Sequence, residues 1–106
     1  MQVLIINFNL NGIDDAQYTT ISREVASAFA AVPGLLSKLW IKNVDTGTYG
    51  GVYIFADRNA LNRFQESDLF RAIAVNKSFA NITASDFEVL DAPTRVTSGV
   101  LTTVAS

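Results

Sequence analysis

Two residue types that are absent from this chain limit the chemistry that its side chains can do. The sequence of 106 residues contains no histidine and no cysteine. These absences exclude Ser-His-Asp and Cys-His triads, disulfides, thiolate metal sites and the usual histidine ligands of zinc, non-haem iron and haem. The glycine-rich nucleotide patterns GxGxxG and GxxxxGK[ST] are missing as well. Any chemistry must use Asp, Glu, Lys, Tyr, Asn or Trp, or the reactivity of the bound compound itself.

Most of the candidate side chains lie in residues 33–56, which we predict to form a β-hairpin. Two β-prone runs flank Asp45–Thr48, a short loop in which Gly47 can supply a positive φ. We expect Val44 to pair with Tyr49, which sets the register of the two strands. The pairs that follow from it are Trp40 with Tyr53, Lys38 with Phe55, and Lys42 with Gly51.

The two faces of this hairpin differ in chemical character. Because side chains alternate across a strand, one face carries only aliphatic groups, while the other carries aromatic rings, two amines and a glycine. The second mixture suits the lining of a pocket or an interface better than the filling of a core. The aliphatic set is Leu39, Ile41, Val52 and Ile54, and the mixed set is Lys38, Trp40, Lys42, Gly51, Tyr53 and Phe55.

Two elements before the hairpin position it. Residues 2–9 predict a strand that is apolar on both faces. A helix starts at Asp14, where Gln17 completes a capping-box pattern, and the helix ends before Pro33. The apolar stripe of this helix predicts that it packs against the sheet.

Two further elements follow the hairpin. Asp57 caps a second helix, which we expect to break and restart near Ser67. A last strand covers about residues 83–91, with Phe87 and Val89 facing inward and acidic side chains facing outward, as in a protected edge strand.

The order βαββαβ predicts an α+β fold of the ferredoxin-like plait type, with sheet order 4-1-3-2 and both helices on one face. We expect one domain over residues 1–97 and a C-terminal tail over residues 98–106 that is flexible or associated with a dimer. The helices cover only one face of a first strand that is apolar on both. Stacking of two sheets in a homodimer would cover the other face.

Composition supports association with a second copy and argues against two other partners. Hydrophobic residues make up 49% of the chain and charged residues 17%, with a mean hydropathy of +0.25. The net charge of −2 and the scattered basic residues predict binding to neither nucleic acid nor an anionic membrane. No membrane span and no secretory leader pattern is present, so we expect a cytoplasmic protein.

Four blocks of sequence resemble one family: NFNLNG, PGLLSKLW, YGGVYIF and FEVLDAPT. Together they are similar to the YdhR-type monooxygenases of the dimeric α+β barrel superfamily, over residues 2 to about 97. The resemblance implies a pocket between sheet and helices, lined by an Asn from the first strand and by Trp or Tyr from the sheet. Asn7 or Asn9 matches the Asn, and Trp40 with Tyr53 matches the aromatic position. Haem-degrading relatives supply a histidine ligand, which this chain lacks, so the resemblance implies no haem.

The activity implied by the resemblance is a cofactor-independent monooxygenase acting on an aromatic or polyketide-like small molecule. An electron-rich phenolate can pass one electron to oxygen without metal or flavin, if the protein favours the anion, aligns it and excludes water. Asn, Trp and Tyr donors would hold the oxygen atoms, and Lys38 or Lys42 would draw the compound toward ionisation. The catalytic candidates are Asn7, Asn9, Trp40 and Tyr53, and the substrate-binding candidates are Lys38, Tyr49, Phe55, Phe64 and Phe70.

Each candidate also has a purely structural interpretation. The Asn side chains could bond to a loop or to a partner's backbone, Trp40 could anchor the core or an interface, and Phe64 and Phe70 could fill the core. The amines could lie in solvent with their stems along the sheet. Two other functions remain open: a non-catalytic module that sequesters a hydrophobic compound, and an isomerase or cyclase that moves a proton with Tyr53 or a lysine.

Overall fold

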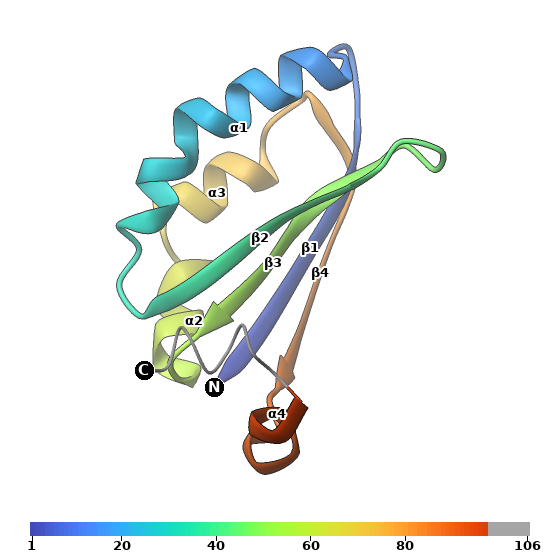
Figure 1. Ribbon diagram of the computed structural model, residues 1–106. Coiled ribbons are helices and arrows are strands. Elements are labelled where there is room, and N and C mark those ends of the chain that lie inside the picture. The colour runs from blue at the N-terminus through green and yellow to red at the C-terminus, as the bar shows by residue number, and fades with distance from the viewer. Residues whose placement is uncertain (98–106) are drawn as a thin grey trace.

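A computed structural model describes residues 1–97, and the predicted tail over residues 98–106 lies outside the described residues. The predicted order of elements is confirmed, with the second helix split in two and one further helix at the end (Figure 1). The elements are β1 (Gln2–Leu10), α1 (Asp15–Ala30), β2 (Leu35–Asn43), β3 (Thr48–Phe55), α2 (Arg58–Gln65), α3 (Asp68–Ala74), β4 (Phe79–Glu88) and α4 (Asp91–Thr97).

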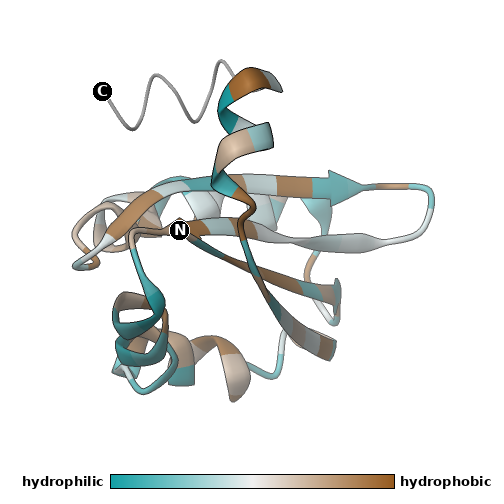
Figure 2. Ribbon diagram, turned by 90° about the horizontal axis from the view of Figure 1, so that it is seen from below, coloured by the Kyte–Doolittle hydropathy of each residue, from teal (hydrophilic) through white to brown (hydrophobic). Residues whose placement is uncertain are grey.

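The strands form one antiparallel sheet in the order β2-β3-β1-β4, as the ferredoxin-like plait requires. Helices α1, α2 and α3 cover one face of it (Figure 1). Apolar residues are nevertheless distributed along the strands, as the brown segments of Figure 2 show. The sheet therefore has one face packed against helices, and the opposite face, here called the uncovered face because no helix among residues 1–97 packs on it, exposes the apolar side chains Leu39, Ile41 and Phe87.

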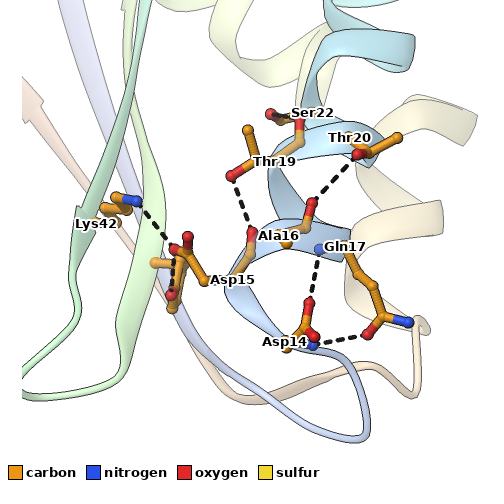
Figure 3. A network of polar contacts seen from close by, with 9 residues as sticks. Asp14, Asp15, Ala16, Gln17, Thr19, Thr20, Ser22 and Lys42 are labelled. Atoms are coloured by element: carbon orange, nitrogen blue, oxygen red, sulfur yellow. Dashed lines mark hydrogen bonds and ion pairs between the residues drawn. The ribbon is translucent and has the colours of Figure 1, made fainter.

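The helices start where the caps predicted. Asp14 and Gln17 form a complete capping box, in which the Gln17 N–H donates to Asp14 Oδ1 at 2.8 Å and the Asp14 N–H donates to Gln17 Oε1 at 2.9 Å (Figure 3). Asp57 Oδ1 accepts from the first turn of α2 at 2.8 Å. Ser67 Oγ accepts from the first turn of α3 at 3.2 Å, which confirms the break at this residue.

The hairpin has the predicted faces but not the predicted register. Lys38, not Trp40, lies opposite Tyr53, and Trp40 lies opposite Gly51. The loop spans residues 44–47, one position earlier than expected, because Gly47 takes its positive φ of 68° at the last loop residue. The resulting shift of two residues preserves the side-chain alternation, so every side chain keeps its face.

The core between sheet and helices is largely aromatic. Phe55 and Phe64 are both fully buried, with ring centroids 5.5 Å apart, and Tyr53 packs on Phe64 at 5.2 Å. Offset and tilted ring pairs of this kind stabilise a core beyond the area that they bury. The core cluster consists of Leu4, Ile6, Phe8, Tyr18, Phe29, Tyr49, Tyr53, Phe55, Ala60, Leu61 and Phe64.

The C-terminal part differs most from expectation. β4 begins and ends earlier than predicted, and Phe87 pairs with Val3 on the uncovered face, where it is 55% exposed; its predicted inward orientation is wrong. Asp86 takes the helix side because Arg58 of α2 reaches it at 3.0 Å. The unpredicted α4 contains Pro93 near its start, where proline is compatible with the first turn of a helix.

Candidate functional site

A cavity of about 140 Å³ lies between the mixed face of the sheet and the helices α1 and α3. Its walls are mainly aromatic and aliphatic, since the aromatic face of the hairpin meets the apolar stripe of α1. The lining residues are Phe8, Lys38, Trp40, Gly50, Gly51, Tyr53 and Phe79 from the sheet, Tyr18, Ile21, Ser22, Val25 and Phe29 from α1, and Leu69, Ala72, Ile73 and Asn76 from α3 and the loop after it.

Lys38 brings an amine into an aromatic enclosure at the cavity wall. Its Nζ lies 3.3 Å from the ring centroid of Trp40, 3.4 Å from that of Phe29 and 4.6 Å from that of Tyr53. Gly51 leaves room for it, because a Cβ at Gly51 would stand 2.8 Å from Lys38 Cε. Burial lowers the pKa of Lys38 to about 7, while the ring faces act in the opposite direction by attracting the ammonium form.

Three aromatic side chains add hydrogen-bond donors to the same cavity. Burial raises the pKa of Tyr18 to about 12 and also raises the pKa of Tyr53 well above its ordinary value, so both hydroxyls keep their protons at neutral pH. Within residues 1–97 neither hydroxyl has a hydrogen-bond partner. Trp40 is 37% exposed and carries an indole N–H, which can only donate.

A second polar cluster lies outside the cavity, where α1 meets the hairpin (Figure 3). Asp15 Oδ1 accepts from the Tyr49 hydroxyl at 2.8 Å and from Lys42 Nζ at 3.0 Å. These two donors, Tyr49 first, hold the pKa of Asp15 below its ordinary value, and the carboxylate raises the pKa of Tyr49. Tyr49 and Lys42 are thus committed to a helix–hairpin contact.

A family model described as "Putative mono-oxygenase ydhR" matches residues 3–100. The chain belongs to this family. No curated protein matches the sequence.

Solved structures similar to this ydhR-family protein share its ferredoxin-like α+β fold. A "putative antibiotic biosynthesis monooxygenase" from Deinococcus radiodurans has a TM-score of 0.71 at 14% identity, covering 87% of this chain and 95% of that one. MhuD of Mycobacterium tuberculosis, described as a heme-degrader, gives 0.68 at 17% identity, with coverages of 85% and 96%. SnoaB of Streptomyces nogalater, described as a cofactor-independent oxygenase, gives 0.64 at 21% identity, with coverages of 83% and 92%.

The two asparagines of β1, one of which was predicted to line a pocket, are not among the lining residues of this cavity in the ydhR-family protein. Alternate residues of β1 face the helices, and Phe8 takes that side between Asn7 and Asn9. Asn9 instead makes structural bonds, donating to the Gly47 carbonyl at 2.9 Å and accepting from Asn81 at 3.0 Å. Asn7 Oδ1 is buried without a partner among residues 1–97.

Of the other candidates, Trp40, Tyr53 and Lys38 meet at the cavity, and the rest do not. Tyr49, Phe55, Phe64 and Phe70 are not among its lining residues. Phe55 and Phe64 pack in the core, and Phe70 packs edge-on against Phe64 at 5.6 Å. The lining residues Phe8, Tyr18 and Phe29 were not predicted from the sequence, and neither was most of the wall that α1 and α3 supply.

A signal for these walls was present in the sequence. Tyr18 and Phe29 belong to the apolar stripe of α1, and a stripe that packs on a sheet must face the aromatic side chains that the hairpin displays. Residues 1–97 of this ydhR-family protein contain no group of three or more His, Cys, Asp or Glu side chains placed to hold a metal ion. No helix in that range is long and apolar enough to cross a membrane.

Proposed function

We propose that this protein is a cofactor-independent monooxygenase acting on an electron-rich aromatic small molecule. The observation that carries the proposal is the cavity itself, in which aromatic and aliphatic walls surround a few convergent donors: Lys38, Trp40, Tyr18 and Tyr53. Family membership and the similarity in fold to SnoaB support the reaction class. Haem is not part of the proposal, because the sequence has no histidine to ligate it.

The chemistry requires little of the protein. In a compound whose activated methylene adjoins a phenolate-bearing ring, the anion passes one electron to oxygen, and the resulting pair combines into a peroxide. Loss of water then leaves a carbonyl, so the methylene gives up both hydrogens and the substrate supplies all the electrons. Trp40 and the two tyrosine hydroxyls can donate to the developing oxygen anions, and the apolar walls exclude bulk water.

Oxygen consumption by the wild type and by paired tyrosine variants tests this proposal. We expect uptake with a panel of electron-rich phenols in the presence of a chelator and without added flavin, nicotinamide or haem. Tyr53→Phe removes a cavity hydroxyl and should lower turnover by up to about a hundredfold. Tyr49→Phe removes a hydroxyl outside the cavity and should leave turnover near that of the wild type. A strict requirement for metal or flavin would eliminate the mechanism.

Binding without reaction would support a different function on the same cavity. If the panel binds tightly and no compound consumes oxygen, the protein is better described as a module that sequesters aromatic compounds. If a bound compound is converted to an isomer without oxygen uptake, proton transfer by Tyr53 or Lys38 becomes the preferred mechanism.

We further propose that the uncovered face of the sheet pairs with a second copy of the chain. Leu39 is 50% exposed on this face, and Ile41 and Phe87 are also exposed. A sheet face with several exposed apolar side chains is expected to be covered by another part of an assembly. Asn7 Oδ1 lies on the same face, so a donor from the second copy could satisfy an acceptor that residues 1–97 leave unpaired.

Sedimentation of two matched variants tests the pairing. The wild type should sediment near twice 11.5 kDa at micromolar concentration. Leu39→Asp places a charge on the uncovered face and should give monomers. Val75→Asp changes a still more exposed apolar residue at the end of α3, away from that face, and should leave the dimer intact. A wild type that sediments as a monomer would disprove the pairing.

A further inference from the structure

Most of the polar side chains that line the cavity carry a hydrogen-bond donor; the exception is Ser22, whose hydroxyl donates to the Thr19 carbonyl at 2.7 Å. Lys38, the Trp40 indole and the Tyr18 and Tyr53 hydroxyls can each donate a hydrogen bond into it. Asn76 follows the same pattern, because its Oδ1 is occupied by the Ser78 N–H at 2.9 Å, which leaves its amide N–H₂ free to donate. No carboxylate is among the lining residues. Such a complement matches a ligand that presents an acceptor, and best of all an oxyanion.

Lys38 is the one cation in this complement. The ion pairs within residues 1–97 involve Lys42, Arg58, Arg71 and the N-terminus but not Lys38. Of the titratable groups in the cavity, Tyr53 of β3 faces the amine, with its ring centroid 4.6 Å from Nζ. Tyr18 of α1 lines the same cavity, and β1, α3 and β4 contribute apolar side chains to it. An amine at an apolar wall without a counter-charge is stabilised strongly by any anion that enters.

The size of the cavity limits what can enter. Its volume of about 140 Å³ is close to that of engineered apolar protein cavities, roughly 150 Å³, that bind benzene. Phe8 and Phe79 are stacked along one wall with centroids 4.1 Å apart, and Phe29 and Trp40 stand at 88° to each other at another. Flat walls of this kind suit a single aromatic ring.

We propose that the cavity takes monocyclic phenols as their phenolates, with Lys38 holding the proton that the phenol gives up. The inference rests on the proposed function, since it names the ligand class and the base for the same cavity. The step is balanced: the phenol O–H bond breaks, an N–H bond forms on Nζ, and the neutral pair becomes a phenolate–ammonium pair with no other reactant. Phenyl methyl ethers of the same shape lack the proton and leave the donors unmatched.

This proton transfer predicts a particular dependence of binding on pH. Because burial lowers the pKa of Lys38 to about 7, the free protein holds a neutral amine just above that pH. The complex contains one proton shared by the amine and the phenol. Below about pH 7 the free amine and the free phenol each carry a proton, and one must be released on binding, so binding weakens. Above the pKa of the phenol neither carries a proton, and one must be taken up on binding, so binding weakens again. Affinity should follow a bell-shaped curve between these two values.

A nitrophenol is the probe of choice, because its phenolate absorbs visible light and its neutral form does not. With the wild type we expect the phenolate spectrum to grow on binding at a pH where the free probe is mainly neutral. We also expect at least tenfold weaker binding of the corresponding nitroanisole. A bound probe that keeps the neutral spectrum, or equal binding of the two compounds, would overturn the inference.

Three variants separate the role of the amine from mere packing. Lys38→Met keeps the length of the side chain and should abolish both the spectral change and the preference for the phenol. Lys38→Arg keeps a permanent charge but cannot accept the proton, so its affinity should rise through the pKa of the probe and lose the decline at high pH. Lys42→Met, which breaks a contact outside the cavity, should behave as the wild type. Unchanged binding by Lys38→Met would refute the assignment.

Oxygen uptake by the same protein preparations with the panel of electron-rich phenols distinguishes the two proposals, since an electron-poor nitrophenol is not expected to reduce oxygen. Phenolate formation without oxygen uptake would sustain the ligand class while removing the monooxygenase. Oxygen uptake that persists in Lys38→Met, with no phenolate signal in the wild type, would sustain the reaction while removing Lys38 as its base.

Discussion

Replacing Lys38 by methionine should make the ligand-free protein more stable at neutral pH. Burial lowers the pKa of Lys38 from 10.5 to about 7, and one pKa unit corresponds to ~1.4 kcal/mol. The full shift sets an upper limit of roughly 4 kcal/mol on the cost of burying this amine at pH 7. The attraction between the ammonium group and the aromatic faces around Nζ offsets part of this cost, on the order of 1–2 kcal/mol. We therefore expect Lys38→Met to raise the free energy of unfolding by about 2 kcal/mol.

The sign of the pH dependence follows from the direction of the shift. Since the folded pKa of Lys38 is the lower one, the unfolded chain binds more protons than the folded chain between about pH 7 and pH 10.5. The stability of the wild type should therefore rise with pH across this window. Lys38→Met lacks the group, so its advantage over the wild type should shrink by roughly 3 kcal/mol between pH 7 and pH 9.5, which removes the advantage expected at pH 7.

Denaturant unfolding of both proteins at several pH values measures this difference. The protein concentration must be fixed, because association would add its own contribution to stability. Titration of the tyrosines cancels in the difference between variant and wild type. Lys42→Met serves as the control, since its exposed amine should give little change. A Lys38→Met protein that is less stable than the wild type by an amount independent of pH would show that the ring contacts outweigh the burial.

Three further outcomes follow from local geometry. Gly50→Ala should lower the free energy of unfolding by roughly 3 kcal/mol in denaturant titrations, because a Cβ there would collide with the Ile6 carbonyl of the neighbouring strand. Asp14→Ala removes one half of a capping box and should cost about 1 kcal/mol, measured in the same way. Tyr49→Phe should raise the pKa of Asp15 toward its ordinary value in an NMR titration, and no movement would show that the hydroxyl is not its main partner.

The elements of this fold could be predicted because each is specified by nearby residues. The capping box at Asp14 and the serine cap at Ser67 act within one helical turn, so sequence alone places both helix starts. The faces of the hairpin follow from alternation, which survives a shift of two residues. The register of the hairpin could not be predicted in this way. It depends on the position that Gly47 takes within the loop, and several types of hairpin loop accommodate one glycine.

The candidate site was predicted only in the part that the hairpin supplies. Trp40, Tyr53 and Lys38 share a face by alternation, and that face is the one that α1 covers. For β1, which is apolar on both sides, the pattern does not say which side meets the helices, and neither Asn7 nor Asn9 is among the residues that line the cavity. That choice is made by tertiary packing of the even-numbered residues, which no local rule specifies.

The adjacent glycines of β3 have different consequences for changing this protein. Gly50 borders the backbone of β1, so a side chain there would push two strands apart. The atoms nearest to a Cβ at Gly51 belong to the end of the Lys38 side chain, to the Tyr53 ring and, at 3.5 Å, to the Leu39 carbonyl. A protein engineer who wishes to reshape the cavity can therefore start at Gly51, where added atoms displace a flexible amine and alter what the cavity accepts while the pairing of the strands is left as it is.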